Sequence, residues 1–171
     1  MFIVEDGTGV VDANAYITVA FFKAYHKDRG TTITSGGGDI EKAIVRATDY
    51  MTARWRFVGL QSTSEQGLHW PAENAFYFDG RVAVDVPIEV QQSCADYALI
   101  ELNSPGSLAP APTVDESGAS VTMKREKVGP IEEETQFGSS GVKHTFKKFP
   151  IPDKRLVKAG LVTNGMSLLR A

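Results

Sequence analysis

Apolar residues recur at helical spacing in several stretches of the chain, most clearly in Gly36–Phe57. A glycine-rich loop ends at Asp39 there, and one apolar face follows, made of Ile40, Ala43, Ile44, Ala47, Met51 and Trp55. Asp39 can accept a backbone N–H, so it is the expected N-cap, and Arg54 and Arg56 suit the C-terminal end of the helix dipole. Because such a helix is not stable alone in water, we predict that the other apolar segments pack around it.

Three further helices are expected to supply that packing. The first follows Thr18, a suitable N-cap, and stops near Gly30. The next is opened by Asp85 and Pro87, and its broad apolar face is predicted to lie on the central helix. The last is a short helix over Asp153–Leu161, after two prolines that stiffen the chain.

The remaining apolar runs predict β structure. Met1–Val4 is typical of an edge strand or a docked arm. One hairpin is predicted over Phe76–Val84 with its turn at Asp79–Gly80, and another over Ala119–Phe137 with its turn at Gly129–Pro130. The arms of the second hairpin carry opposite charges, and pairing across the strands would help to set the register: Lys124, Arg125 and Lys127 face Glu132, Glu133 and Glu134.

These elements predict a mainly α fold with β: a small helical bundle core with β-hairpin excursions and an extended C-terminal arm. The 171 residues suit one domain with a tail. We expect residues 1–137 to form the helical core with its hairpins, and residues 138–171 to form the arm with a short helix and a docking tail. The tail, Met166–Ala171, is mostly apolar, so burial by another chain or by the domain itself is expected.

Composition narrows the class of protein. The formal net charge of -3 argues against a general nucleic-acid binder, which usually carries a basic surplus. A single cysteine, Cys94, cannot form an internal disulfide. No apolar run is long enough to span a bilayer, and the N-terminus turns acidic at once, unlike a secretory signal. An intracellular product with no membrane contact is therefore expected.

Motifs for catalysis or cofactors are not found in the sequence. The three histidines are far apart, without a second ligand at metal-binding spacing. No phosphate-binding G-x-x-x-x-G-K-[ST] motif and no G-x-S-x-G nucleophile motif occurs. Cys94 lies in a predicted helix with no histidine nearby, which favours a core residue over a nucleophile. We expect no catalytic activity, no cofactor and no metal site.

Two clusters mix cations with aromatic rings, as single-strand binders do. The first is Arg54–Phe57, and the second, Lys143–Phe149, offers as candidate nucleic-acid contacts Lys143, Phe146, Lys147 and Lys148. Each has a simpler interpretation, which is favoured. In the first, the cations end a helix and Trp55 continues its apolar face; the second is a basic strand that pairs with an acidic surface.

Several segments, in order and spacing, resemble a known family. They are Ile3–Val19, Ala43–Trp55, Leu68–Pro71, the helix after the Asp79–Gly80 turn, and Lys124–Glu134. Together they span nearly the whole chain and resemble the head–tail connector, or adaptor, proteins of long-tailed bacteriophages. Sequences of this kind are often labelled DnaT-like single-stranded-DNA-binding proteins.

The resemblance implies a structural virion protein. Copies would form a ring, expected to be twelvefold, between the portal protein and the next neck or tail-completion protein. The ring would extend the channel through which double-stranded DNA passes without specific binding. The protein would be made in the host cytoplasm and located in the neck of the virion. The residues expected to contact the portal or a neighbouring copy are Leu161, Met166, Leu168, Leu169 and Arg170, with the charged hairpin positions Lys124, Arg125, Lys127, Glu132, Glu133 and Glu134.

Two functions from different classes therefore stand at this point. The first is the non-catalytic neck connector that the resemblance implies. The alternative is a replication-type protein that binds single-stranded DNA. The two differ in whether the basic segment Lys143–Lys148 is available to DNA or is held in protein contacts, and the sequence does not decide between them.

Overall fold

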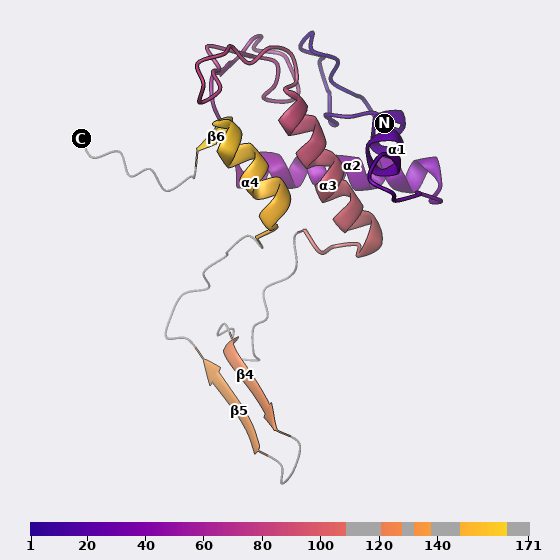
Figure 1. Ribbon diagram of the computed structural model, residues 1–171, viewed down its shortest axis with the longest axis vertical. Coiled ribbons are helices and arrows are strands. Elements are labelled where there is room, and N and C mark those ends of the chain that lie inside the picture. Colours follow the sequence, from indigo (N-terminus) through magenta and orange to yellow (C-terminus); the bar gives the residue numbers. More distant parts are fainter. Residues whose placement is uncertain (109–120, 128–131, 138–147, 164–171) are drawn as a thin grey trace, which may run out of the picture. The chain divides into compact units, whose positions relative to one another are not determined.

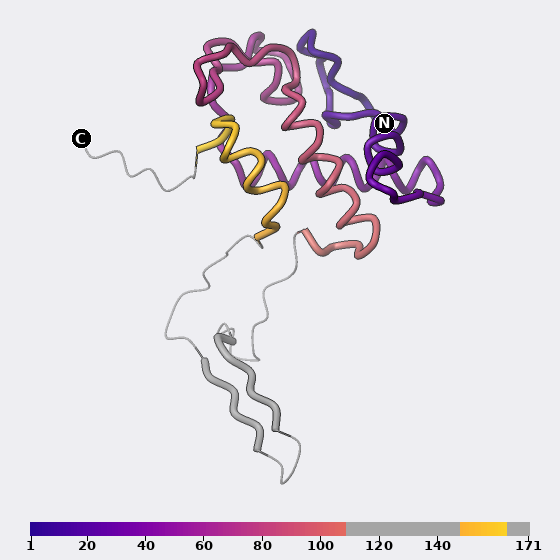
Figure 2. The backbone as a smooth tube through the Cα atoms, viewed as in Figure 1, coloured from indigo at the N-terminus to yellow at the C-terminus, as the bar shows by residue number. Residues whose placement is uncertain are grey.

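A computed structural model of the chain describes residues 1–108, 121–127, 132–137 and 148–163 (Figures 1 and 2). The chain divides into two compact units. One is formed by Met1–Leu108 together with Lys148–Ala171, and the other is Ala109–Lys147. The first unit holds all four helices of the described residues, which are α1 (Val19–Lys27), α2 (Gly37–Arg54), α3 (Ile88–Asn103) and α4 (Pro150–Ala159). None of them is both long and apolar enough to cross a membrane.

The helix ends follow local capping chemistry. Thr18 caps α1 as predicted, because its hydroxyl oxygen accepts the backbone N–H of Phe21 at 3.0 Å. The prediction for α2 was wrong by three residues: Gly36 is the N-cap, and Asp39 lies in the first turn, where it binds Lys42 at 3.2 Å. A carboxylate in that turn still suits the helix dipole. Pro150 begins α4 three residues earlier than expected, since a first-turn proline needs no N–H partner.

The core forms where α2, α3 and α4 meet. In Figure 1, α3 and α4 lie side by side and both cross α2. Small side chains let α2 and α3 approach closely: the Thr48 hydroxyl lies 3.6 Å from the sulfur of Cys94. The buried face of α2 contains Ile40, Ala43, Ile44, Ala47, Thr48, Tyr50 and Met51. The predicted central role of this helix is confirmed.

The C-terminal segment that the sequence assigned to an arm packs on this core as far as it is described. Leu156 of α4 and Leu161 after it are both fully buried. Strand β6 (Val162–Thr163) then pairs antiparallel with β1 (Arg56–Phe57), directly after α2. Leu161, expected to contact a portal or a neighbour, is therefore a core residue, because the β1–β6 pair holds it inside.

The N-terminal segment is a docked arm, as one of the two predictions had it. Val4 bridges Ala15 in parallel, and the buried carboxylate of Glu5 closes the loop that follows. That carboxylate accepts three backbone N–H groups, at 2.8–2.9 Å, from Gly7, Gly9 and Val10. Beyond α2, a second small antiparallel pair joins β2 (Leu60–Gln61) to β3 (Ala72–Glu73).

Both predicted hairpins are found. In the first unit, Phe76 bridges Val82 around the turn at Asp79–Gly80. In the second unit, β4 (Val121–Lys127) pairs antiparallel with β5 (Glu132–Phe137), and its backbone register sets Arg125 opposite Glu134 and Lys127 opposite Glu132. The turn at Gly129–Pro130 lies outside the described residues. The predicted fold class, a helical core with β hairpins, is confirmed.

Candidate functional site

Most side chains of the first basic and aromatic cluster, Arg54–Phe57, are buried or paired inside the protein. Arg54 ends α2 and its side chain is only 10% exposed, with Nη2 donating to Asp153 Oδ2 at 2.6 Å. Trp55 and Phe57 are buried. Arg56 alone of the four is exposed. The simpler interpretation, helix-end cations beside a continued apolar face, is confirmed for Arg54 and Trp55.

A buried polar network holds that cluster against α4. Asp153 receives Arg54 and the backbone N–H of Phe149 on one oxygen, at 2.6 and 2.9 Å, and the hydroxyl of Tyr97 on the other, at 2.5 Å. The indole N–H of Trp55 donates to the same tyrosine oxygen at 3.3 Å. Charge-assisted bonds of this kind are strong and directional, so the network fixes α4 on α2 and α3.

The second cluster, Lys143–Phe149, lies largely outside the described residues, including Lys143, Phe146 and Lys147. Lys148 is described and exposed. Phe149 is buried at the N-cap of α4, with its ring edge-on to Tyr50 and Tyr97. The end of this cluster is therefore fixed in the core, and its last lysine faces solvent.

Exposed aromatic rings gather instead on the Phe76–Val82 hairpin. Phe78 is 79% exposed and Phe76 is 51% exposed. The Phe78 N–H donates to the Ala159 carbonyl at 3.2 Å, which seats the hairpin on the end of α4. Gly160 permits this contact: a Cβ there would lie 3.0 Å from the Phe78 backbone nitrogen, and its φ of 80° favours glycine. The hairpin and the helix end thus form one surface.

A pocket of about 330 Å³ opens beside Phe78. The cations that line it differ in how far they are neutralised. Arg81 Nε binds the Asp79 carboxylate at 2.8 Å. Arg155 is held by Asp96 at 2.7 Å and by the Tyr25 hydroxyl at 3.0 Å. Lys158 is exposed and has no ion pair with a described residue.

Tyr77 also lines this pocket. Its ring faces the Arg81 guanidinium, whose Cζ lies 4.6 Å from the ring centroid, and its hydroxyl donates to Glu89 Oε2 at 2.9 Å. Burial, with the hydrogen bond to Glu89, raises the pKa of Tyr77 to about 12. The ring therefore stays neutral at physiological pH and holds the guanidinium in place.

The outer face of α4 extends this surface. Lys154 and Lys158 are exposed one turn apart, and the only carboxylate of the helix, Asp153, is buried. We call Phe78, Arg81, Lys154 and Lys158 the basic–aromatic surface. The sequence analysis missed it because it joins a hairpin to a helix that is 70 residues or more away along the chain. The hairpin signal and the lysine spacing were visible separately, but their contact was not.

A second hollow, of about 610 Å³, lies beside the buried cluster. Arg56 and Leu60 are exposed on it, and His69 is half-buried with its ring stacked on Phe57. His69 Nε2 lies 2.9 Å from the Val58 carbonyl, to which it donates. This hollow offers one exposed cation and no exposed aromatic ring, so it fits nucleic acid less well.

Groups with nucleophilic or metal-binding chemistry are not gathered in the described part of the chain. No three or more His, Cys, Asp or Glu side chains there cluster as metal ligands. Cys94 is fully buried, and burial raises the pKa of its thiol to about 12. The thiol therefore stays protonated, in agreement with its predicted place in the core.

Exposed rings beside exposed lysines are the combination of side chains that single-strand-binding proteins use. The comparison with protein families agrees with this class. The family model described as "Putative DnaT-like ssDNA binding protein" matches residues 1–170, so the chain belongs to that family. The searches of curated proteins and of solved structures found no match.

The family corrects the connector interpretation. The matched family is described by single-stranded DNA binding, and no comparison supports a head–tail connector, a ring on a portal protein or a passive channel for double-stranded DNA. The expected contact residues Met166, Leu168, Leu169 and Arg170 lie outside the described residues, whereas Leu161 is buried. The predicted place in the virion neck came from the same resemblance.

Proposed function

We propose that this protein binds single-stranded DNA through the basic–aromatic surface, as a binding protein without a catalytic role. Membership of the DnaT-like family supports the class of ligand. The observation that carries the location is the 79% exposure of Phe78 at the mouth of a pocket that Lys158 also lines.

Phe78 is suited to base stacking. Exposed phenylalanine is unfavourable in water, and this ring is held in place by the backbone bond to Ala159 and the close contact with Gly160. Every base has a π-face, so stacking on such a ring is tolerant of sequence and contributes about 1–3 kcal/mol per base. Bases of a duplex are already stacked, so the ring favours single strands.

The lysines of α4 are suited to the phosphates. Lys158 lines the Phe78 pocket without a described ion-pair partner, and Lys154 follows one turn away on the same face. Arg81 is expected to contribute less, because the Asp79 carboxylate already neutralises it. The net charge of -3 does not exclude DNA binding at this surface, because the field of exposed charges is screened beyond a Debye length of about 10 Å.

The test is fluorescence anisotropy of a labelled oligothymidine titrated with the full chain at low and moderate salt. Replacing Phe78→Ala is expected to weaken binding about tenfold, from the loss of one stacked base. Lys158→Glu is expected to weaken DNA binding more at low salt than at moderate salt, because the lost contact is electrostatic. Circular dichroism checks that each variant is folded.

Two matched controls sharpen the test. Phe76→Ala removes a ring from the same hairpin that does not line the pocket, and Lys42→Glu removes an exposed lysine near the start of α2. Both are expected to leave the affinity within about twofold, the range usual for surface changes away from a site. Equal losses from Phe78→Ala and Phe76→Ala, or no binding by the unaltered chain at low salt, would refute the proposal.

A further inference from the structure

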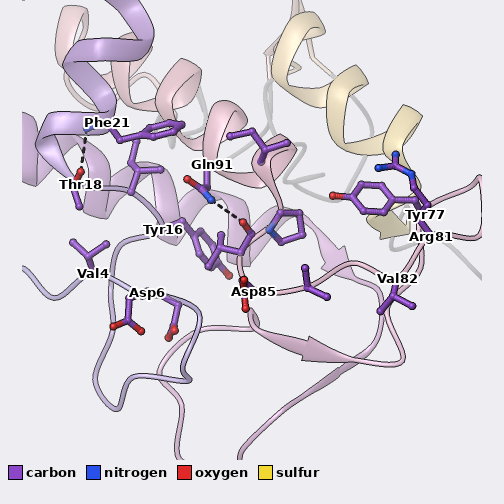
Figure 3. Close-up of a pocket in the computed structure, with 16 residues that line it drawn as sticks. Val4, Asp6, Tyr16, Thr18, Phe21, Tyr77, Arg81, Val82, Asp85 and Gln91 are labelled. Atoms are coloured by element: carbon purple, nitrogen blue, oxygen red, sulfur yellow. Dashed lines mark hydrogen bonds between the residues drawn. The ribbon is translucent and has the colours of Figure 1, made fainter.

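A groove of about 600 Å³, lined by both aliphatic and polar side chains, lies beside the Phe76–Val82 hairpin, and Figure 3 shows these side chains. Three of its aliphatic residues are exposed: Val82 by 58%, Val84 by 65% and Ile88 by 46%. Phe21 and Val4 line the groove opposite them. Neighbouring aliphatic side chains left in water indicate a binding surface.

One wall of the groove is an open strand edge. Val82 and Val84 lie on one side of an extended segment, whereas Ala83 between them is 1% exposed and packs inward. The inner edge is paired, because Tyr77 N–H donates to the Arg81 carbonyl and Ala83 N–H to the Ala75 carbonyl, both at 2.9 Å. The backbone groups of Val82 and Val84 face the other way and have no partner among the described residues. Such an edge can accept an added strand.

The far end of the groove is acidic. Asp6 and Asp85 are exposed there, lie near each other in Figure 3, and have no ion pair with a described residue. Gly7 allows this approach, since a Cβ at that position would lie 2.9 Å from the Cβ of Asp85. Arg81 lines the opposite end of the groove, where it is paired with Asp79. The two carboxylates at the far end repel a phosphate backbone, so that end favours a cation of a peptide over DNA.

We propose that this groove binds the chain's own C-terminal segment, Met166–Arg170, as a strand added to the Val82–Val84 edge. Every second residue of that segment fits the groove in order. In a strand, Met166, Leu168 and Arg170 share one face, so two aliphatic side chains come before one cation. The groove presents Val82, then Val84, then the Asp85 and Asp6 carboxylates.

The course of the chain allows this docking. Gly160 lies against Phe78, which is next to the Val82 end of the groove, and β6 ends three residues later at Thr163. The eight residues from 164 to 171 span at most about 27 Å when extended. In the proposed docking, the segment enters at Val82 and ends at the acidic side, parallel to Val82–Asp85. This burial also accounts for the apolar character of the C-terminal segment, and it does not use Phe78 or Lys158, on which the DNA-binding proposal depends.

The test is amide hydrogen exchange of the full chain followed by NMR. The amides of Val82 and Val84 are expected to be protected in the unaltered chain. Leu168→Asp is expected to speed their exchange about tenfold or more, because it releases the added strand. Leu169→Asp is the matched control, since in the proposed strand position 169 lies on the face opposite to positions 166, 168 and 170. Unchanged protection of Ala98 in α3 shows that each variant is folded.

Other outcomes would overturn the proposal. Rapid exchange of Val82 and Val84 in the unaltered chain would mean that the groove is open. Equal effects of Leu168→Asp and Leu169→Asp would remove the alternation on which the docking rests. Protection that rises with protein concentration would show that the strand comes from a second copy and not from the same chain.

Discussion

The Arg54–Phe57 cluster and the Phe78–Lys158 pair contain the same kinds of side chain, yet the fold uses them in opposite ways. In the first, the Arg54 guanidinium is held by Asp153 and the rings of Trp55 and Phe57 are buried. In the second, the Phe78 ring is 79% exposed and Lys158 has no described ion-pair partner. Cations mixed with rings along a sequence therefore do not by themselves indicate a nucleic-acid site, because the rings must also be exposed to stack on bases.

The difference follows from the element that carries each cluster. Trp55 continues the apolar face of α2, which packs against α3, and its indole N–H donates to Tyr97 of that helix, so its ring is buried. Phe78 lies beside the tight Asp79–Gly80 turn. A turn this short has no residues to spare that could cover the Phe78 side chain. Four predictions test this comparison.

The largest contrast is expected in stability. Trp55→Ala should lower the free energy of unfolding by about 3–5 kcal/mol, as loss of a buried aromatic side chain does. Phe78→Ala should change it by less than about 1 kcal/mol, because most of the ring is already in water. Urea denaturation followed by circular dichroism measures both. Equal losses would mean that the Phe78 ring is part of the core.

Asp153 and Asp79, which bind Arg54 and Arg81, should also differ in how much they contribute to stability. Asp153→Asn leaves the Arg54 cation buried without its counter-charge, and should cost about 3 kcal/mol of stability. Asp79→Asn breaks the exposed pair with Arg81 and should have no measurable effect, because water screens it. Thermal unfolding at fixed pH compares them. A stable Asp153→Asn variant would show that the buried polar network around Asp153 does not fix α4.

The salt dependence of DNA binding should separate contact lysines from other lysines. If Lys158 neutralises one phosphate, Lys158→Gln should reduce the slope of log K against log salt by about 0.7. Lys42→Gln, at an exposed lysine paired with Asp39, should leave the slope unchanged. Titrations at four or more salt concentrations measure both slopes. An identical slope for Lys158→Gln would remove this residue from the interface.

The smallest effect concerns His26, a ring that becomes a cation on protonation and is buried. Its Nε2 donates to the Ala95 carbonyl at 3.1 Å, and burial lowers its pKa below the usual 6.5. The unfolded chain therefore takes up the proton first, so stability should fall as the pH drops from about 6.5 toward the folded pKa, and should not depend on His26 above that range.

His26→Gln should flatten this part of the stability curve, since glutamine can keep the hydrogen bond without the charge. Denaturation midpoints between pH 5 and 8 measure it, and the difference between the two curves removes the contribution of carboxylates that still titrate near pH 5. The same slope in the unaltered chain and the variant would assign the pH dependence to other groups.

Much of the fold was predictable from local patterns. The four helices, the Thr18 cap, the central place of α2 and both hairpins follow from periodicity, capping and turn chemistry, which act over a few residues. The errors were also local: the start of α2 moved to Gly36 and that of α4 to Pro150, because glycine and proline permit a first helical turn without requiring its exact position.

The candidate site was not predictable in the same way. Phe78 and Lys158 are 80 positions apart, and nothing local to either indicates that the Ala159 carbonyl receives the Phe78 N–H. Leu161 gives the opposite case. The resemblance implied that it contacts the portal or a neighbouring copy, but it is fully buried because β6 pairs with β1, which lies more than 100 residues earlier in the chain.

The sequence by itself determined which segments are helices and hairpins, and it carries the family to which the chain belongs. Only the tertiary structure decided which basic and aromatic side chains reach solvent. The reason is physical: helix and turn formation depend on neighbours a few residues away, whereas exposure depends on which distant element covers a residue. In the folded chain Trp55 is buried and Phe78 is exposed, and this difference in exposure defines the proposed DNA-binding surface.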